Sequence, residues 1–256
     1  MPYFERLSEN SFRPTEHVSG GWNTAEQHIA PPMGLLAHAV ERDRDARRSD
    51  GLRLARLSYD ILGTLPMEPV EVDVRVMRPG RTIELVEASL SHGGRIALTL
   101  RAWLLDTRDT TVLDGTAFDR IPPADQMPEW DPSTVWPGGY IASAQARRVQ
   151  TAPGRAAYWV RSDVALLADE FVGPVARAAR IFDIANGMTV RADPKDVAFP
   201  NLDLTAHLFR EPEGDWLGFD TRVSAGPVGA GLTDSVIHDT TGAIGKVSQI
   251  QTVRPR

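Results

Sequence analysis

The sequence lacks the residues and motifs of several familiar kinds of catalytic site. There is no cysteine, so thiol nucleophiles, thiolate metal ligands and disulfides are absent. No GxSxG motif occurs, which disfavours a serine hydrolase. No HExxH or related spacing is found, so we expect no metal site; the histidines are His17, His28, His38, His92, His207 and His238.

Asp203 is a carboxylate on the polar side of a predicted strand. Leu204 and Ala206 alternate with Asp203 and Thr205, so the aspartate points away from the apolar face. A carboxylate with its ordinary pKa of about 3.9 is a weak base, and burial must raise that pKa before it can help to deprotonate water. From the pattern alone, a purely structural role remains the alternative.

The length and net charge of the chain indicate which classes of protein it can belong to. The chain has 256 residues, with 28 Lys plus Arg against 34 Asp plus Glu, a net charge of −6. This charge argues against a nucleic-acid partner, which usually requires a basic surface. No apolar run approaches the roughly 20 residues of a membrane span, and the first residues do not resemble a secretory signal. We therefore expect a cytoplasmic globular protein.

Proline and glycine divide the chain nearly in half. The densest proline cluster, at 121–139, predicts an extended linker between a first domain at 1–120 and a second at 140–256. Alternating or β-branched runs before the linker predict antiparallel strands at 52–62, 70–78, 81–91 and 95–105. Pro31 and Pro32 precede a predicted helix at 33–48.

The second half repeats the pattern of the first. Strand-like runs occur at 156–164, 201–209, 216–224, 231–238 and 243–253, with a helix-like run at 172–188. An offset of 147 residues superposes RLSYDIL on DLTAHLF and VEVDVRV on LGFDTRV, and places Arg75 on Arg222. Identity is low, so the repeat is predicted from pattern and turn position.

A long helix against an antiparallel sheet, present twice, resembles the α+β double hotdog fold. The chain is similar to the acyl-CoA thioesterase II family in the aspartate of FPNLDLTAHLFREP, the spacing of WLGFDTRVS and the glutamine of GKVSQIQTVRP. This resemblance implies hydrolysis of acyl-CoA thioesters to free acid and CoA. It also implies a homodimer or larger assembly.

The resemblance assigns catalysis to Asp203, Ser224 and Gln249, which would hold and activate the attacking water. Ser224 stands where better-known members carry threonine, and it precedes a GPVGAG loop, where a serine often only bonds a turn. Gln249 cannot act as a base, but its amide could orient the water. In the first half, Arg56 and Met77 occupy the positions that match Asp203 and Ser224 at the offset of 147, and Arg101 matches Gln249 after a one-residue shift in the next hairpin. The sequence therefore predicts one catalytic centre, in the second half.

Two further substrate contacts are predicted. The backbone amides of Met33 and Gly34, at the expected helix start, could bind the developing oxyanion, although PPMG could equally just begin a helix. The arginines of ERDRDARR (41–48) could meet the phosphates of coenzyme A, although a solvated helix end is the simpler interpretation.

The sequence thus predicts an acyl-CoA thioesterase that needs no metal or bound cofactor, CoA being part of the substrate. The alternative is a non-catalytic module that binds acyl thioesters or lipids in the same pocket. A hydratase ranks last, because the segment that begins the helix lacks a hydratase-type pair of Asp and His.

Overall fold

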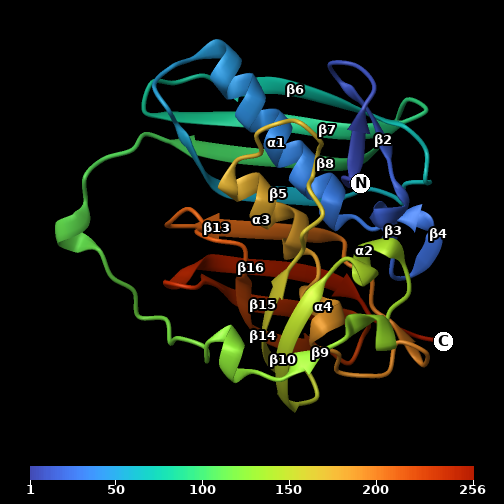
Figure 1. The fold of residues 1–256 in the computed structure, drawn as a ribbon. Helices are drawn as coiled ribbons and strands as arrows, with labels where there is room; N and C mark the ends of the chain where they lie inside the picture. The colour runs from blue at the N-terminus through green and yellow to red at the C-terminus, as the bar shows by residue number, and fades with distance from the viewer.

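Thirteen strands form one antiparallel sheet in the computed structural model, which describes residues 1–256 (Figure 1). The first half of the chain contributes β1 (Phe4–Arg6), β2 (Ser11–Pro14), β5 (Arg53–Ile61), β6 (Val70–Arg78), β7 (Ile83–His92) and β8 (Arg95–Leu105). The second half contributes β9 (Glu129–Trp130), β10 (Gln145–Ala152), β11 (Arg155–Arg161), β13 (Asp203–Leu208), β14 (Leu217–Ala225), β15 (Ala230–Asp239) and β16 (Gly242–Thr252). The strand order is β1-β2-β6-β7-β8-β5-β13-β16-β15-β14-β11-β10-β9.

Counted outward from the junction of β5 and β13, equivalent strands of the two halves follow one another in the same order. Adding 147 to the bounds of β6, β7 and β8 gives the bounds of β14, β15 and β16. At the junction, Ser58 pairs with Thr205, its own equivalent at that offset, and their hydroxyls lie 3.0 Å apart. The repeat predicted from the sequence is therefore confirmed by the order, length and pairing of the strands.

Two helices lie side by side on one face of this sheet (Figure 1). They are α1 (Ala30–Arg47) and α3 (Pro174–Phe182), and the shorter α2 (Gly139–Ala142) and α4 (Ala185–Met188) lie near the second half. Prolines at the start of α1 and α3 suit a first helical turn, where their missing N–H is not needed. The predicted helix at 172–188 is in fact broken into α3 and α4 by a turn at Asp183 and Ile184.

Close contact between α1 and α3 depends on Gly34. A Cβ at this position would lie 2.7 Å from Arg180 Cβ and 3.1 Å from the Ala176 carbonyl oxygen. Apolar side chains of both helices, including Leu35 and Phe182, join one continuous buried core with the sheet. The small residue thus sets the distance between the two helices.

A long connection between the two halves begins after β8 and extends away from the rest of the molecule (Figure 1). Part of the predicted linker, 121–139, contacts the second half. Trp159 Nε1 donates to the Pro122 carbonyl at 2.8 Å, and β9 pairs with β10. The domain boundaries stay a prediction. None of the helices combines the length and apolar character that a membrane crossing requires.

Replacing Gly34 by alanine should destabilise the protein by about 1–3 kcal/mol, because the added methyl group overpacks the contact with Arg180. Gly115→Ala is the control, since no atom lies within 4 Å of its added Cβ. Thermal unfolding of both variants measures the effect. Equal melting temperatures for the two would show that the helices can separate without cost.

Candidate active site

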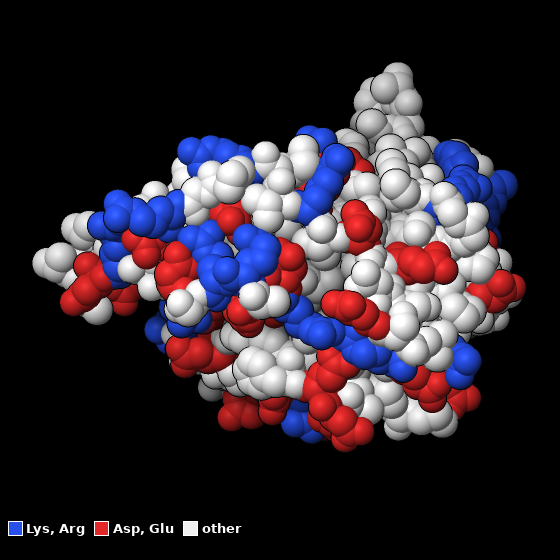
Figure 2. Space-filling view, turned by 90° about the horizontal axis from the view of Figure 1, so that it is seen from above, with Lys and Arg blue, Asp and Glu red and all other residues white.

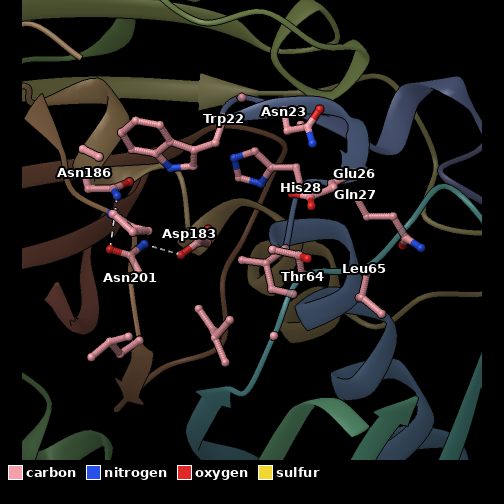
Figure 3. A pocket seen from close by; sticks show the side chains of 18 of the residues that line it. Trp22, Asn23, Glu26, Gln27, His28, Thr64, Leu65, Asp183, Asn186 and Asn201 are labelled. Atoms are coloured by element: carbon pink, nitrogen blue, oxygen red, sulfur yellow. Dashed lines mark hydrogen bonds between the residues drawn. The ribbon is translucent and has the colours of Figure 1, made fainter. Parts of the chain in front are cut away.

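A cavity of about 560 Å³ opens beside the helix break between α3 and α4 (Figure 3). One wall comes from the hairpin of β3 (Ser19–Gly20) and β4 (Asn23–Gln27) and the two residues before α1, and another from the end of β5 and the segment after it. The second half closes it with the turn after α3, the segment before β13 and the chain after β16. Its polar lining residues include Asn23, Glu26, Gln27, His28, Thr64, Asp183, Asn186, Asn201, Arg254 and Arg256.

Asp183 is the buried acid of this cavity. It directly follows α3, and the helix break frees its side chain to meet two amides from other elements. Asn201 Nδ2 donates to Asp183 Oδ1 at 2.6 Å, and Gln249 Nε2 donates to the same oxygen at 2.7 Å. Figure 3 shows Asn201 between Asp183 and Asn186. The other carboxylate oxygen, Oδ2, has no donor from the protein.

Other amides fix the orientation of Asn201. Asn186 Nδ2 donates to Asn201 Oδ1 at 3.1 Å, and Gln251 Nε2 donates to that oxygen at 3.0 Å. With two donors on its oxygen, Asn201 must direct its NH₂ group toward Asp183. The carboxylate therefore sits in a network whose members hold one another in place.

Burial changes the proton affinity of Asp183. Loss of hydration disfavours the charged carboxylate and raises the pKa of Asp183 to about 7, although the hydrogen bonds from Asn201 and Gln249 oppose the shift. A carboxyl group with a pKa near neutrality can accept and return a proton at physiological pH. Asp183 has the properties of a general base.

His28 is a neutral histidine on the opposite wall. Its ring packs against Tyr140, with centroids 4.1 Å apart, and burial lowers the pKa of His28 to about 3. Nδ1 accepts a hydrogen bond from the Ala30 backbone N–H at 3.2 Å. The neutral ring therefore carries its proton on Nε2. His28 lines the cavity, where this N–H can act as a donor.

A small apolar recess of about 30 Å³ lies behind the main cavity. The Trp22 ring, part of both walls, packs edge-on against Trp136 with centroids 4.8 Å apart. Ile141, Ile184 and Met188 line the recess. Asp183 thus borders both the main cavity and the small recess.

The expectation that Asp203, Ser224 and Gln249 converge is wrong, because the sheet separates them. Gln249 is buried on the helix side, where it contacts Asp183. Ser224 is exposed on the opposite face of the sheet. It pairs with Leu232, and Leu232 pairs with Ile250, so these three residues share one face. Ile250 directly follows Gln249, and consecutive residues of a strand point to opposite faces.

Asp203 also lies outside the helix-side face. Its neighbour Leu204 points into the core, and Asp203 Oδ1 accepts from the Ile250 backbone N–H at 2.7 Å. This bond ties β13 to β16 and gives the carboxylate a structural role. Neither Asp203 nor Ser224 lines the cavity.

The expected oxyanion contacts of Met33 and Gly34 also need correction. The helix begins at Ala30, earlier than predicted, so the Met33 N–H already donates to the Ile29 carbonyl at 3.0 Å. Gly34 faces Arg180, and neither residue lines the cavity.

Asp183, Asn201 and His28 were missed by sequence reasoning. The repeat contained a signal for the acid and its two amides. At the offset of 147, Asp183, Asn201 and Gln249 fall on Leu36, Leu54 and Ala102, which are all buried in the core of the first half. β8 and β16 keep this offset, so the expected match of Gln249 with Arg101 is wrong by one residue. Polar residues at positions that are apolar in the other copy mark the site.

Two antiparallel repeats, each with a helix on the same face of a shared sheet, define the double hotdog class of α+β proteins. Similar solved structures place this chain in the same class. The hot dog protein of unknown function from Alicyclobacillus acidocaldarius gives a TM-score of 0.76 at 12% identity, over 97% of this chain and 95% of that one. A protein from Novosphingobium aromaticivorans gives 0.74 at 15% identity, over 98% of both chains.

The family follows from the sequence profiles. The profile of the acyl-CoA thioesterase N-terminal domain matches residues 18–105, and that of the acyl-CoA thioesterase C-terminal domain matches residues 118–253. The chain belongs to the acyl-CoA thioesterase family and is a thioester hydrolase. The acyl-CoA thioesterase II TesB2 from Mycobacterium marinum is similar in structure, with a TM-score of 0.69 at 19% identity over 99% of this chain and 96% of that one. A search of curated proteins gave no match.

The raised pKa of Asp183 predicts a pH-dependent cost to folding. The carboxyl is protonated in the folded protein up to about pH 7 but in the unfolded chain only to about pH 3.8. Relative to Asp183→Asn, the wild type should lose stability as pH rises from about 4 to about 7 and level off above that. Melting temperatures across this range measure the difference. Asp203→Asn is the control, and a difference between wild type and Asp183→Asn that does not vary with pH would contradict the assignment.

Proposed function

We propose that the protein hydrolyses acyl-CoA thioesters to a free acid and CoA by means of a water activated by Asp183. One observation carries the proposal: a buried carboxylate has two amide donors on one oxygen and leaves the other without a protein partner beside a cavity. The amides hold the acid, and its raised pKa suits it to remove a proton from water.

Gln249 contacts Asp183 without lining the cavity, and in the proposed centre it supplies a second contact for that water. Its Nε2 is bound to Asp183, whereas its Oε1 is buried with no hydrogen-bond partner. A buried acceptor without a partner costs free energy, so a water donating to Gln249 Oε1 would relieve that cost. The prediction that Gln249 orients the water is thus retained, with Asp183 and Asn201 in place of Asp203 and Ser224.

The reaction proceeds by addition and elimination. Asp183 takes a proton from the water as its oxygen bonds to the thioester carbonyl carbon. The carbon–sulfur bond then breaks, and the Asp183 proton passes to the departing thiolate. His28 Nε2–H donates to the carbonyl oxygen as negative charge develops there. No step needs a metal or a bound cofactor.

The repeat explains why one chain would hold one such centre. The first half has leucine and alanine at the equivalent positions, and these cannot bind or activate water. All residues of the proposed centre come from one chain. Association into a homodimer or larger assembly stays a prediction from the family resemblance.

Asp183→Asn should lower kcat/KM for acyl-CoA by on the order of a hundredfold or more, because the amide cannot accept the proton. Release of CoA, followed with a thiol reagent, gives the rate. Asp203→Asn and Ser224→Ala are matched controls and should stay near wild type. Loss of activity in the controls alone would restore the assignment made from the sequence, and saturable acyl-CoA binding without turnover by the wild type would favour a binding module.

The activity should rise with pH as Asp183 ionises. The protonated carboxyl cannot act as the base, so kcat/KM is low below its pKa and reaches half its plateau near pH 7. The pH profile of kcat/KM with one acyl-CoA provides the measurement. A profile with its midpoint near pH 4 would show that the base has an unperturbed pKa.

His28→Phe should lower kcat by on the order of a hundredfold while changing KM much less, since phenylalanine keeps the packing against Tyr140 but removes the N–H donor. The midpoint of the pH profile should not move, because His28 is neutral throughout. His207→Phe, at an exposed position of β13, is the control. A shifted midpoint in His28→Phe would instead indicate that His28 titrates during the reaction.

A further inference from the structure

The arginines predicted from the sequence to meet CoA phosphates are engaged elsewhere. Arg47 and Arg48 share Glu84, at 2.8 and 2.9 Å. Arg44 pairs with Asp45 at 2.8 Å, and Arg42 lies 3.8 Å from Glu170. None of these arginines lines the cavity. On the face that Figure 2 shows, basic and acidic side chains are interspersed rather than gathered by sign.

Two other arginines are placed differently. Arg254 and Arg256 lie on β17 (Arg254–Pro255) and directly after it, and both line the cavity with exposed side chains. No carboxylate forms an ion pair with either, although the protein carries net negative charge and pairs many of its other arginines. Glu26 is the other acidic residue besides Asp183 in the lining, and it forms no ion pair with them.

Backbone contacts hold these arginines at the rim. β17 pairs with β12 (Val197–Ala198), and the Arg256 N–H donates to the Asp196 carbonyl at 2.8 Å. The Arg256 guanidinium lies 5.5 Å from the centroid of the Trp22 ring, a cation–π contact between the chain after β16 and the turn between β3 and β4. Gln249 lies a few residues earlier on the same stretch of chain. The positions of the two arginines are therefore fixed relative to the proposed centre.

This arrangement fits the chemistry of coenzyme A. Its phosphates lie at one end of a long pantetheine arm and its thioester at the other. Arginine binds phosphate through paired N–H donors, and two arginines without carboxylate partners need not break an ion pair to do so. With the thioester beside Asp183, the arm would run through the cavity toward the rim.

We propose that Arg254 and Arg256 bind the phosphate groups of coenzyme A at the mouth of the cavity. This inference rests on the proposed function and adds to it a recognition site for the nucleotide end of the substrate. Binding there holds the carrier while the thioester reacts, so its effect falls on KM rather than on kcat.

The test compares one acyl group on two carriers, CoA and pantetheine, which lacks the nucleotide phosphates. Arg254→Gln/Arg256→Gln should raise KM for acyl-CoA about tenfold or more, with kcat unchanged, and leave kcat/KM for acyl-pantetheine unchanged. The wild-type KM for acyl-CoA should also rise with salt, and this dependence should weaken in the variant.

Arg81→Gln/Arg222→Gln is the matched control, because it removes the same charge from two exposed arginines outside the cavity that form no ion pair. Its kinetics should equal those of the wild type. Equal effects of the two double variants, or an equal loss on both carriers, would overturn the phosphate site.

Direct binding separates this inference from the proposed reaction. Adenosine 3′,5′-bisphosphate should bind the wild type in calorimetry and bind about tenfold more weakly to Arg254→Gln/Arg256→Gln, while adenosine should not distinguish them. If no thioester is hydrolysed but this difference appears, the reaction fails and the phosphate site stands. If thioesters are hydrolysed and the bisphosphate binds both proteins equally, the reverse holds.

Discussion

The burial of one carboxylate governs the site. Asp183 lies almost out of contact with solvent, and its charge is tolerated because Asn201 and Gln249 both donate to the same oxygen. Taking an acid out of water raises its pKa, and amide donors limit how far the pKa rises. The balance leaves a base whose strength suits neutral pH. The surrounding elements serve to create that balance, since the acid, its donors and the facing histidine all come from different segments.

The fold could be predicted from the sequence largely because it depends on alternation and turn position. Strands predicted at 70–78 and 95–105 have those bounds in the structure, and the offset of 147 relates whole strands of the two halves. Such patterns are local, so a single chain displays them. The sequence does not predict β9 and β10, because both strands are partly exposed and lack a clear apolar alternation.

The site was harder to predict because it depends on contacts between distant segments. Asp203 had the expected residue type in the expected motif, yet it lies on the wrong face of its strand. Asp183, the acid of the proposed centre, lies in a run whose pattern predicts one continuous helix. Only the break after α3 directs its side chain to Gln249. Of the three residues predicted to bind water, Gln249 alone contacts this acid. Comparison of the two halves position by position would have indicated the right face.

The pairing of Ser58 with Thr205 places equivalent residues of the two halves against each other at the centre of the sheet. An assembly of two identical subunits would have to keep every substitution compatible with both copies at once. Two copies within one polypeptide are free of that obligation. Here one half has buried apolar residues at the positions where the other has an acid and its amides, while the pairing at the centre of the sheet is kept.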